Sequence, residues 1–195
     1  MATLKQLDPD VFTIEGLFTP EECRELISRA ESIGFEPASV RTRSGPQMMP
    51  NIRNNDRVVL VDQELAEELW QRVAPLLPTL DDAVATGVDS TLRFYRYVPG
   101  QKFNRHRDGS ATNELGETSK LSYLIYLNSC DGGATLFRDY VEIDGHREKK
   151  ELRIEPAPGT ALLFRHKRWH EGLPVASGEK YVLRTDVFYA QTTTE

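Results

Sequence analysis

The second half of the chain limits the possible folds most strongly, because it is a series of short strand-like runs separated by turns. β-branched and aromatic residues, which favour strands, are concentrated in the runs, and Gly, Pro, Asn and Asp separate them. Short strands at fairly even spacing predict an antiparallel sandwich or barrel. Asp144-Gly145 is expected to form a hairpin tip. The runs cover residues 91–98, 119–128, 134–140, 151–154, 160–166 and 180–190.

A short strand and two helices are predicted ahead of this region, which makes the class α+β, mainly β. Residues 11–18 have the composition of a strand, and Thr19-Pro20-Glu21-Glu22 then has the cap, proline and capping-box carboxylate of a helix start. This helix should end at Gly34. Its apolar face is expected to contain Cys23, Leu26, Ile27, Ala30 and Ile33. A second helix should begin near Asp62, with helically spaced Leu65, Leu69, Val73 and Leu76.

Two linking segments are expected between these elements, and residues 37–56 are predicted to be loop or irregular strand. Residues 79–90 are acidic and small, which indicates a connector. Residues 37–56 are rich in Pro, Ser, Thr and Asn, and a loop of that length is usually functional or mobile. It can be a lid that contacts substrate or an ordinary solvated loop. Its candidate substrate-contacting cations are Arg41, Arg43, Arg53 and Arg57.

Composition narrows the class of protein and the class of partner. The 195 residues suit a single domain over 1–195, with 1–90 as helical support and lid loop and 91–190 as the β core. The net charge of −6 disfavours a general nucleic-acid coat or a membrane-surface binder. No apolar run reaches the length of a membrane span. Cys23 and Cys130 form no disulfide framework, which favours a reducing, cytoplasmic location.

His106-Arg-Asp108 is the first candidate for chemistry. On an extended strand, residues two apart point to the same face, so the imidazole and the carboxylate would stand side by side. One histidine and one carboxylate, joined by a distant second histidine, form the facial triad of non-haem Fe(II) oxygenases. His-x-Asp is a weak signal by itself, and it needs a second histidine in the right context.

His170 is the best candidate for that second histidine. His146 lies in the charged hairpin tip, where exposure to solvent is expected. His166 and His170 both follow an apolar run, and a turn and a final strand come after His170. Lys180 and Arg184 alternate onto one face of that final strand.

A metal held by His106, Asp108 and His170 would keep coordination positions open for a 2-oxo acid and O2. The other carboxylate of such a cosubstrate needs a cation, because an unpaired buried charge is very unfavourable. Lys180 is the candidate for this role, and Arg184 is the alternative.

Longer motifs around these residues resemble the Fe(II)/2-oxoglutarate-dependent dioxygenases of the prolyl 4-hydroxylase-like branch. The segment Tyr97-x-x-Gly100-x-x-Phe103-x-x-His106-x-Asp108 is similar to the one that opens the core of that family. The runs 124–137 and 156–164 resemble its following strands and turns. The distal histidine of the family, followed by Lys or Arg, matches His170 and Lys180. The resemblance covers about residues 11–190.

The resemblance implies a double-stranded β-helix, or jelly-roll (cupin-like), core with supporting N-terminal helices. It implies Fe(II), 2-oxoglutarate and O2, with ascorbate as a candidate reductant. It makes His106, Asp108 and His170 the metal ligands and catalytic residues, and Lys180 the partner of the 2-oxoglutarate carboxylate. Arg184 stands where collagen-type members often have Thr, so it can face 2-oxoglutarate, the substrate, Asp186 or Glu171. The further cofactor-binding candidates are Tyr97, Tyr126 and Arg184.

The expected reaction is hydroxylation of an unactivated C–H bond with release of succinate and CO2. A prolyl or other residue of a peptide or protein is the leading substrate, and a free amino acid or metabolite is the close alternative. A nucleic-acid demethylase is less favoured, because no basic patch is interleaved with aromatic residues. A non-catalytic module is disfavoured because all the ligands are present.

Basic residues close to both ligand segments suggest a positive rim that steers an anionic substrate. Ordinary solvent-facing side chains are the alternative interpretation, and Trp169 can form a wall of the substrate opening. The basic residues are Arg93, Arg96, Lys102, Arg105, Arg107, Arg165, His166, Lys167 and Arg168.

Overall fold

The computed structural model describes residues 2–42 and 44–192. Arg43, a predicted lid cation, lies outside the described residues, and the side chain of Arg41 is not described either. The N-terminal elements are β1 (Thr3–Asp8), β2 (Val11–Glu15), α1 (Pro20–Ile33), β3 (Glu36–Pro37), β4 (Val40–Thr42), β5 (Gly45–Gln47), β6 (Asp56–Val61), α2 (Gln63–Val73), a 3-10 turn (Ala74–Leu76) and β7 (Ala83–Val88). The remaining elements are β8 (Thr91–Tyr97), β9 (Phe103–His106), β10 (Thr118–Tyr126), β11 (Asp131–Gly132), β12 (Thr135–Ile143), β13 (His146–Ile154), β14 (Thr160–Arg165), β15 (His170–Gly172), β16 (Val175–Ser177) and β17 (Lys180–Gln191).

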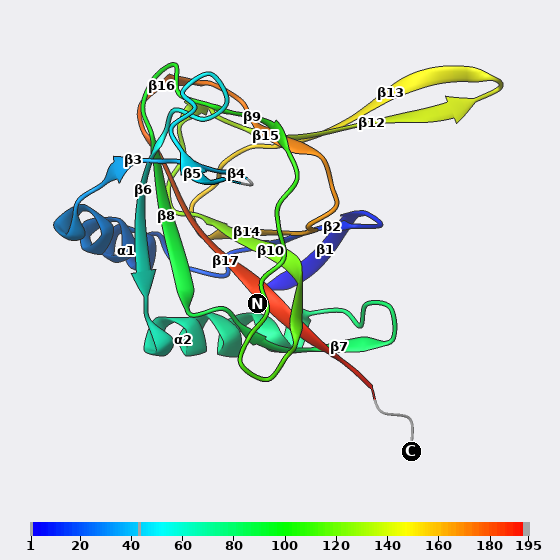
Figure 1. Cartoon of the computed structure of the whole chain (residues 1–195), viewed down its shortest axis with the longest axis horizontal. Helices are drawn as coiled ribbons and strands as arrows, with labels where there is room; N and C mark the ends of the chain where they lie inside the picture. Colours follow the sequence, from blue (N-terminus) through cyan, green and yellow to red (C-terminus); the bar gives the residue numbers. More distant parts are fainter. Residues whose placement is uncertain (1, 43, 193–195) are drawn as a thin grey trace.

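A large and a small antiparallel sheet form the two β layers (Figure 1). The large sheet has nine strands in the order β1-β2-β14-β10-β17-β8-β6-β3, with β7 also paired to β17. The small sheet has the order β13-β12-β15-β9. Strands β11 and β16 form a separate pair, as do β4 and β5. This arrangement is the predicted jelly-roll core with helices packed against it.

Alternation along the central strands gives the large sheet two different faces. In β10, Leu121, Tyr123 and Ile125 join the cluster that packs against the helices, whereas Tyr126 joins the cluster between the two sheets. The inter-sheet cluster includes Phe137 of the small sheet. The large sheet is therefore the middle of three layers, with α1 and α2 on one side and the small sheet on the other.

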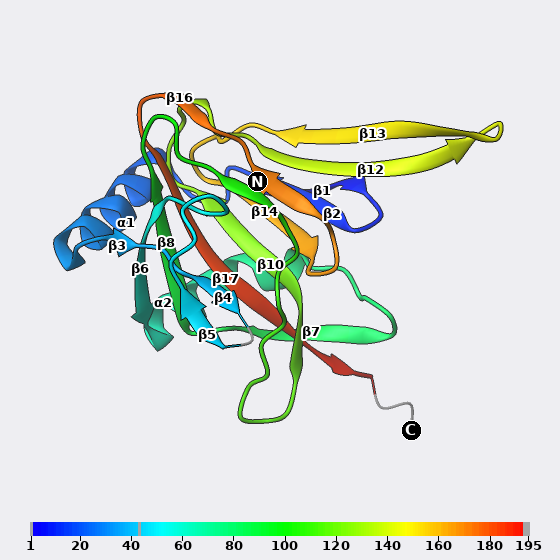
Figure 2. The same ribbon diagram turned by 45° about the horizontal axis from the view of Figure 1, so that its top comes forward.

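The β12–β13 hairpin extends past the rest of the small sheet and projects from the molecule (Figures 1 and 2). Its tip confirms the predicted turn, because Ile143 pairs with His146 around Asp144 and Gly145. Both turn residues have positive φ, +53° and +75°, which matches the twist of a two-residue hairpin turn.

The predicted helices are confirmed, including the start of α1. The Glu22 backbone N–H donates to Thr19 Oγ1 at 3.2 Å, and the Thr19 N–H donates to Glu22 Oε2 at 2.7 Å, which is the expected capping box. Gly34 follows the last helical residue. Ile33 was wrongly placed on the buried face and is 49% exposed, because the last turn extends past the sheet.

Two segments differ from the sequence prediction. Residues 79–90 are not only a connector, since they contain β7, which pairs with β17. Strand β6 lies in a segment for which no strand was predicted, although its Val58-Val-Leu-Val61 run favours a strand. The short β4 and β5 within residues 37–56 fit the irregular-strand alternative for that segment. In the described parts of the chain, neither helix has the length and apolar character of a membrane span.

Gly159 joins the start of α1 to the large sheet, and we expect alanine there to be strongly destabilising. The residue has φ +72°, and a Cβ would lie 1.9 Å from the Phe18 carbonyl oxygen. Left-handed strain and the clash together should lower the free energy of unfolding by roughly 3 kcal/mol or more. Urea denaturation measures the loss.

Gly116→Ala is the matched control, because Gly116 has φ +78° with open space around its Cα. This variant should lose only the free energy of unfolding that left-handed backbone strain costs, about 1–2 kcal/mol. Equal losses in the two variants would show that the Phe18 contact is unimportant.

Candidate active site

Strand pairing brings the two predicted histidine ligands together. His106 is the last residue of β9 and His170 is the first of β15, and the two are paired directly across these strands. Their ring centroids are 4.2 Å apart. Asp108 lies just past the end of β9 rather than on an extended strand, which corrects the predicted geometry. One ligand atom from each of the three residues nevertheless lies within 4.8 Å of the others.

The histidine rings are oriented with one nitrogen toward Asp108. His106 Nε2 is 3.6 Å from Asp108 Oδ1, and His170 Nε2 is 3.8 Å from Asp108 Oδ2. The other nitrogen, Nδ1, donates to the Asn104 carbonyl oxygen in His106 (2.8 Å) and to the Arg168 carbonyl oxygen in His170 (3.1 Å). A carbonyl only accepts, so each ring in its neutral form carries its proton on Nδ1 and keeps an Nε2 lone pair free.

The ionisation states also suit metal ligands. Burial lowers the pKa of His170 to about 4, with Asp108 opposing the shift, so this imidazole is neutral near pH 7. Burial tends to raise the pKa of Asp108, but Arg184 and the two histidines outweigh it and hold this pKa well below its usual range. Two neutral imidazoles and one carboxylate fit a divalent metal with open coordination positions.

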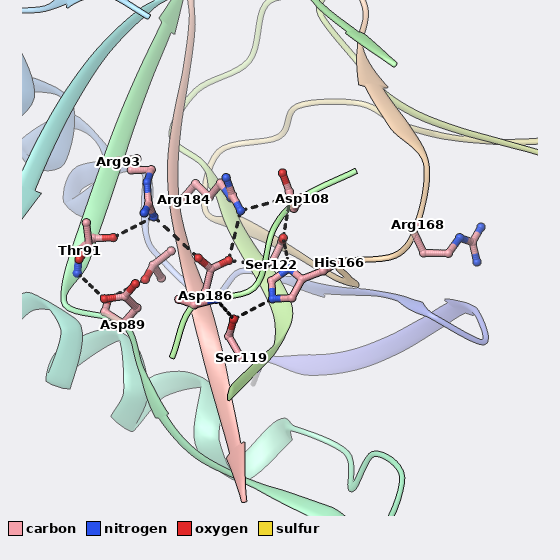
Figure 3. Close-up of polar contacts among 12 residues, drawn as sticks. Asp89, Thr91, Arg93, Asp108, Ser119, Ser122, His166, Arg168, Arg184 and Asp186 are labelled. Carbon is pink, nitrogen blue, oxygen red and sulfur yellow. Dashed lines mark hydrogen bonds and ion pairs between the residues drawn. The ribbon is translucent and has the colours of Figure 1, made fainter. Parts of the chain in front are cut away.

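A directional chain of hydrogen bonds holds Asp108 from below (Figure 3). Ser122 Oγ donates to Asp108 Oδ2 at 2.6 Å, which uses its only hydrogen. The 3.0 Å contact between Ser122 and His166 Nδ1 must then be donated by the histidine. His166 Nε2 accepts from Ser119 Oγ at 2.9 Å, and Ser119 accepts the Ala111 backbone N–H. Burial lowers the pKa of His166, in agreement with a neutral ring.

Arg184 holds Asp108 from the side (Figure 3). Its Nη2 lies 3.4 Å from Asp108 Oδ2 and 3.2 Å from Asp186 Oδ1. Arg93 approaches Asp186 from the other side, with Nη1 3.8 Å from Oδ2. Burial opposes the charge on Arg184, but the two carboxylates outweigh it and raise its pKa. Of the alternatives predicted for Arg184, the structure shows the pair with Asp186 and adds Asp108.

Lys180 lies in the same pocket without a carboxylate partner among the described residues. Alternation along β17 places Lys180, Val182 and Arg184 on the inter-sheet face, as predicted. Lys180 Nζ donates to the Gly133 carbonyl oxygen at 2.6 Å and is 5.3 Å from the Tyr97 ring centroid. Burial lowers its pKa to about 8.

The pocket lies between the two sheets and contains the predicted ligands and both candidate cations. Tyr97 lines it, whereas Tyr126 lies behind the lining, 5.4 Å from Lys180 Nζ, and donates to Thr135 Oγ1 at 2.7 Å. The remaining walls are largely aromatic and aliphatic. The lining residues are Tyr95, Tyr97, Phe103, His106, Asp108, Leu124, Thr135, His170, Gly172, Lys180, Val182 and Arg184.

The predicted basic rim is smaller than the sequence indicated. Arg93, Arg96, Arg165, Lys167 and Arg168 all pair with carboxylates, and His166 is buried. Arg105 and Arg107 have no carboxylate partner among the described residues, and both stack on Trp169, with Cζ 5.0 and 4.7 Å from the ring centroid. A groove lined by these three residues opens beside His106 and Asp108.

Sequence reasoning did not identify Ser122, Ser119 or the role of His166. A signal for Ser122 was present, since it is a hydroxyl residue in the largely apolar second part of β10, from Leu121 to Tyr126, and pairs directly with Asp186 on β17. A serine and an aspartate that face each other in a buried sheet indicate a network of polar contacts.

Comparison with known proteins agrees with this site. The 2OG-Fe(II) oxygenase superfamily matches residues 92–185, where 2OG is 2-oxoglutarate. The chain is 25% identical over 203 residues to Prolyl 4-hydroxylase 2 of Arabidopsis thaliana, covering 89% of this chain but only 65% of that relative. The chain therefore spans less than two thirds of the length of this relative.

Solved structures give the same fold. The viral collagen prolyl hydroxylase of Paramecium Bursaria Chlorella virus-1, in its 2OG complex, has a TM-score of 0.60 at 22% identity, over 91% of this chain and 95% of that one. A Trichoplax adhaerens prolyl hydroxylase, solved with a peptide fragment of the hypoxia inducible factor oxygen degradation domain, has a TM-score of 0.64 at 18% identity, over 92% and 83%.

The segment that matches the 2OG-Fe(II) oxygenase superfamily, residues 92–185, contains the histidine–aspartate–histidine cluster, and the solved structures share the jelly-roll fold. Prolyl 4-hydroxylases are among the homologues and structural neighbours of this chain.

We expect Ser122→Ala to weaken metal binding, because it removes the hydroxyl that holds Asp108 in place. Loss of such an outer hydrogen bond typically lowers metal affinity by about 10- to 100-fold. Titration with Mn(II), followed by electron paramagnetic resonance, measures the change. Ser119→Ala is the graded control, since it leaves the Ser122–Asp108 bond intact and should have a smaller effect. Unchanged affinity in Ser122→Ala would contradict the role given to this chain of bonds.

Proposed function

We propose that this protein is an Fe(II)- and 2-oxoglutarate-dependent dioxygenase that hydroxylates an unactivated C–H bond and releases succinate and CO2. The observation that carries the proposal is the metal-competent cluster of His106, Asp108 and His170 in one pocket with the buried, carboxylate-free Lys180. A prolyl or other amino-acid residue of a peptide or protein is the proposed substrate, because relatives and structural neighbours are named as prolyl hydroxylases.

The residues fit the metal that the family uses. His106, Asp108 and His170 would hold Fe(II), and their backbone and side-chain hydrogen bonds fix them before it binds. Bound iron supplies the activation of O2 coupled to decarboxylation of 2-oxoglutarate. The protein contributes orientation, and its largely apolar walls exclude water.

Lys180 is the proposed partner of the distal 2-oxoglutarate carboxylate. Arg184 is already neutralised by Asp108 and Asp186, whereas the ammonium of Lys180 has the Gly133 carbonyl as its one hydrogen-bond acceptor among the described residues. An incoming carboxylate would satisfy the free donors and remove the penalty of a buried charge. Tyr97 and Tyr126 flank this end of the pocket.

We propose that residues 1–195 act as a single domain in the cytoplasm, with ascorbate as the reductant. A free amino acid or metabolite is the alternative substrate.

We expect His106→Ala to abolish iron-dependent succinate formation while the fold is kept. The assay screens peptide and metabolite pools for succinate release with Fe(II), 2-oxoglutarate and ascorbate, and mass spectrometry detects the added oxygen atom. His146→Ala is the matched control, because His146 is exposed on the projecting hairpin. Retained turnover in His106→Ala would refute the ligand assignment, and no succinate from the wild type with any pool would refute the activity.

We expect 2-oxoglutarate binding to depend on the protonation of Lys180. Its pKa of about 8 means that the charged form is complete below pH 7 and is lost as the pH rises through 8. Affinity for 2-oxoglutarate should therefore fall by up to about tenfold per pH unit above pH 8. Calorimetric titration of the Mn(II)-loaded protein measures this.

Lys180→Ala should weaken 2-oxoglutarate binding by about 30-fold or more and remove most of the pH dependence. A strong effect of Arg184→Gln with no effect of Lys180→Ala would show that Arg184 is the partner instead.

A further inference from the structure

Arg53 is a buried cation without a carboxylate partner beside the active-site pocket. It is 5% exposed, and its guanidinium lies between two rings, with Cζ 4.3 Å from the Tyr95 centroid and 4.5 Å from the Phe103 centroid. Its Nε donates to Asn55 Oδ1 at 2.7 Å, while Nη2 is buried without a hydrogen-bond partner. No carboxylate of the described residues forms an ion pair with it.

Such a cation is costly unless an anion joins it. Burying a charged group carries a penalty of several kcal/mol, and neighbouring aromatic rings recover only about 1–2 kcal/mol of it. Two other largely buried arginines near the site have carboxylate partners: Arg184 pairs with Asp108 and Asp186, and Arg168 with Asp8 and Asp139. Arg53 differs from them because nothing in the described parts of the chain neutralises it.

The position of Arg53 connects it to the metal cluster. Tyr95 and Phe103, the rings on either side of it, both line the pocket that holds the cluster. Phe103 also stacks on His106, with ring centroids 3.5 Å apart. The guanidinium is therefore one aromatic ring away from a candidate metal ligand.

The surroundings of Tyr95 show how positive this end of the pocket is. Burial tends to raise the pKa of the Tyr95 hydroxyl, yet Arg53, Arg184 and Arg93 outweigh it and lower this pKa. An anion entering here would meet a positive potential that the described residues do not cancel.

The loaded site leaves Arg53 without a carboxylate of its own. In the proposed function the two carboxylates of 2-oxoglutarate are taken by the metal and Lys180, Asp108 pairs with Arg184, and Asp186 is shared by Arg184 and Arg93. The cosubstrate is therefore not the anion that Arg53 requires. Besides O2, the other participant that binds in the pocket is the substrate to be oxidised.

We propose that Arg53 forms a carboxylate-binding subsite and that the substrate carries a carboxylate which Arg53 holds beside the metal cluster. This proposal rests on the proposed function. A guanidinium offers two parallel donors that match the two oxygens of a carboxylate. The backbone around Arg53 is fixed, because Asn54 N–H donates to the Lys102 carbonyl oxygen and Asn104 N–H donates to the Ile52 carbonyl oxygen, so only the side chain of Arg53 has to turn toward the ligand.

The carboxylate can come from an acidic residue of a peptide or from a free carboxylic acid, and two pairs of probes separate these sources. One pair is N-acetylproline and N-acetylprolinamide. The other is a blocked peptide with one proline flanked by glutamates and the same peptide with glutamines. Each probe is tested for stimulation of succinate release, and its binding to the Mn(II)- and 2-oxoglutarate-loaded protein is measured without O2.

We expect the wild type to bind the acid of at least one pair about 30-fold or more tightly than its amide. Arg53→Gln should lose this preference by weakening binding of the acid alone, and Arg53→Lys should recover part of it because the charge is kept. Thermal unfolding and Mn(II) binding check that both variants are folded.

Arg107→Gln is the comparison, because it removes a cation of the exposed rim. Its effect should be about threefold or less and should disappear at high salt, as expected for screened surface charges.

Equal binding of acid and amide by the wild type in both pairs would overturn the proposal, as would an acid preference that survives in Arg53→Gln. The same salt-sensitive loss in Arg53→Gln and Arg107→Gln would also overturn it, since the rim would then be the cause. Failure of the proposed function is distinguishable, because succinate release would be absent in the wild type while the anaerobic binding arm still tests Arg53.

Discussion

The two-residue alternation of β10 and β17 is the constraint on which the rest of the structure depends. Each strand places apolar residues against the helices from one face and presents a different set to the small sheet from the other. In β17 this rule puts Leu183 in the helix-side core and Lys180 and Arg184 in the pocket. A slip of one residue would exchange the two faces and place both cations among the helices.

A second constraint on the site is that its buried charged groups need partners of opposite charge. Asp108 is held as an anion by Arg184, and Arg184 in turn by Asp186, so the carboxylate faces the histidines already ionised. Breaking any one of these contacts would leave an unpaired charge, which is far more unfavourable than removing the whole set. The hydrogen bonds that run from Ser119 through His166 and Ser122 to Asp108 belong to the same set of contacts beside the large sheet.

Much of this arrangement could be predicted from the sequence, because its signals are local. Thr19 and Glu22 specify the start of α1, and the motifs around His106, Asp108 and His170 resemble those of a known metal cluster, which the strand pairing then brings together. What could not be predicted depends on partners far apart in the chain. Strand β7 exists because β17 offers an edge, and Arg53 resembled any loop arginine until Tyr95 and Phe103 were found to enclose it.

The projecting β12–β13 hairpin affects self-association of the protein through its free sheet edge. Strand β13 is the outer edge of the small sheet, and an unpaired edge can add a strand from another chain. Its residues from His146 to Glu151 are all exposed and mostly charged. Glu151 pairs with Arg138 across the ribbon and with Lys149 along the same strand. A strand of another molecule would have to desolvate this run of mixed charges to join the sheet. The charged side chains of β13 therefore oppose the addition of further strands. They protect a long free sheet edge from assembling into a fibre.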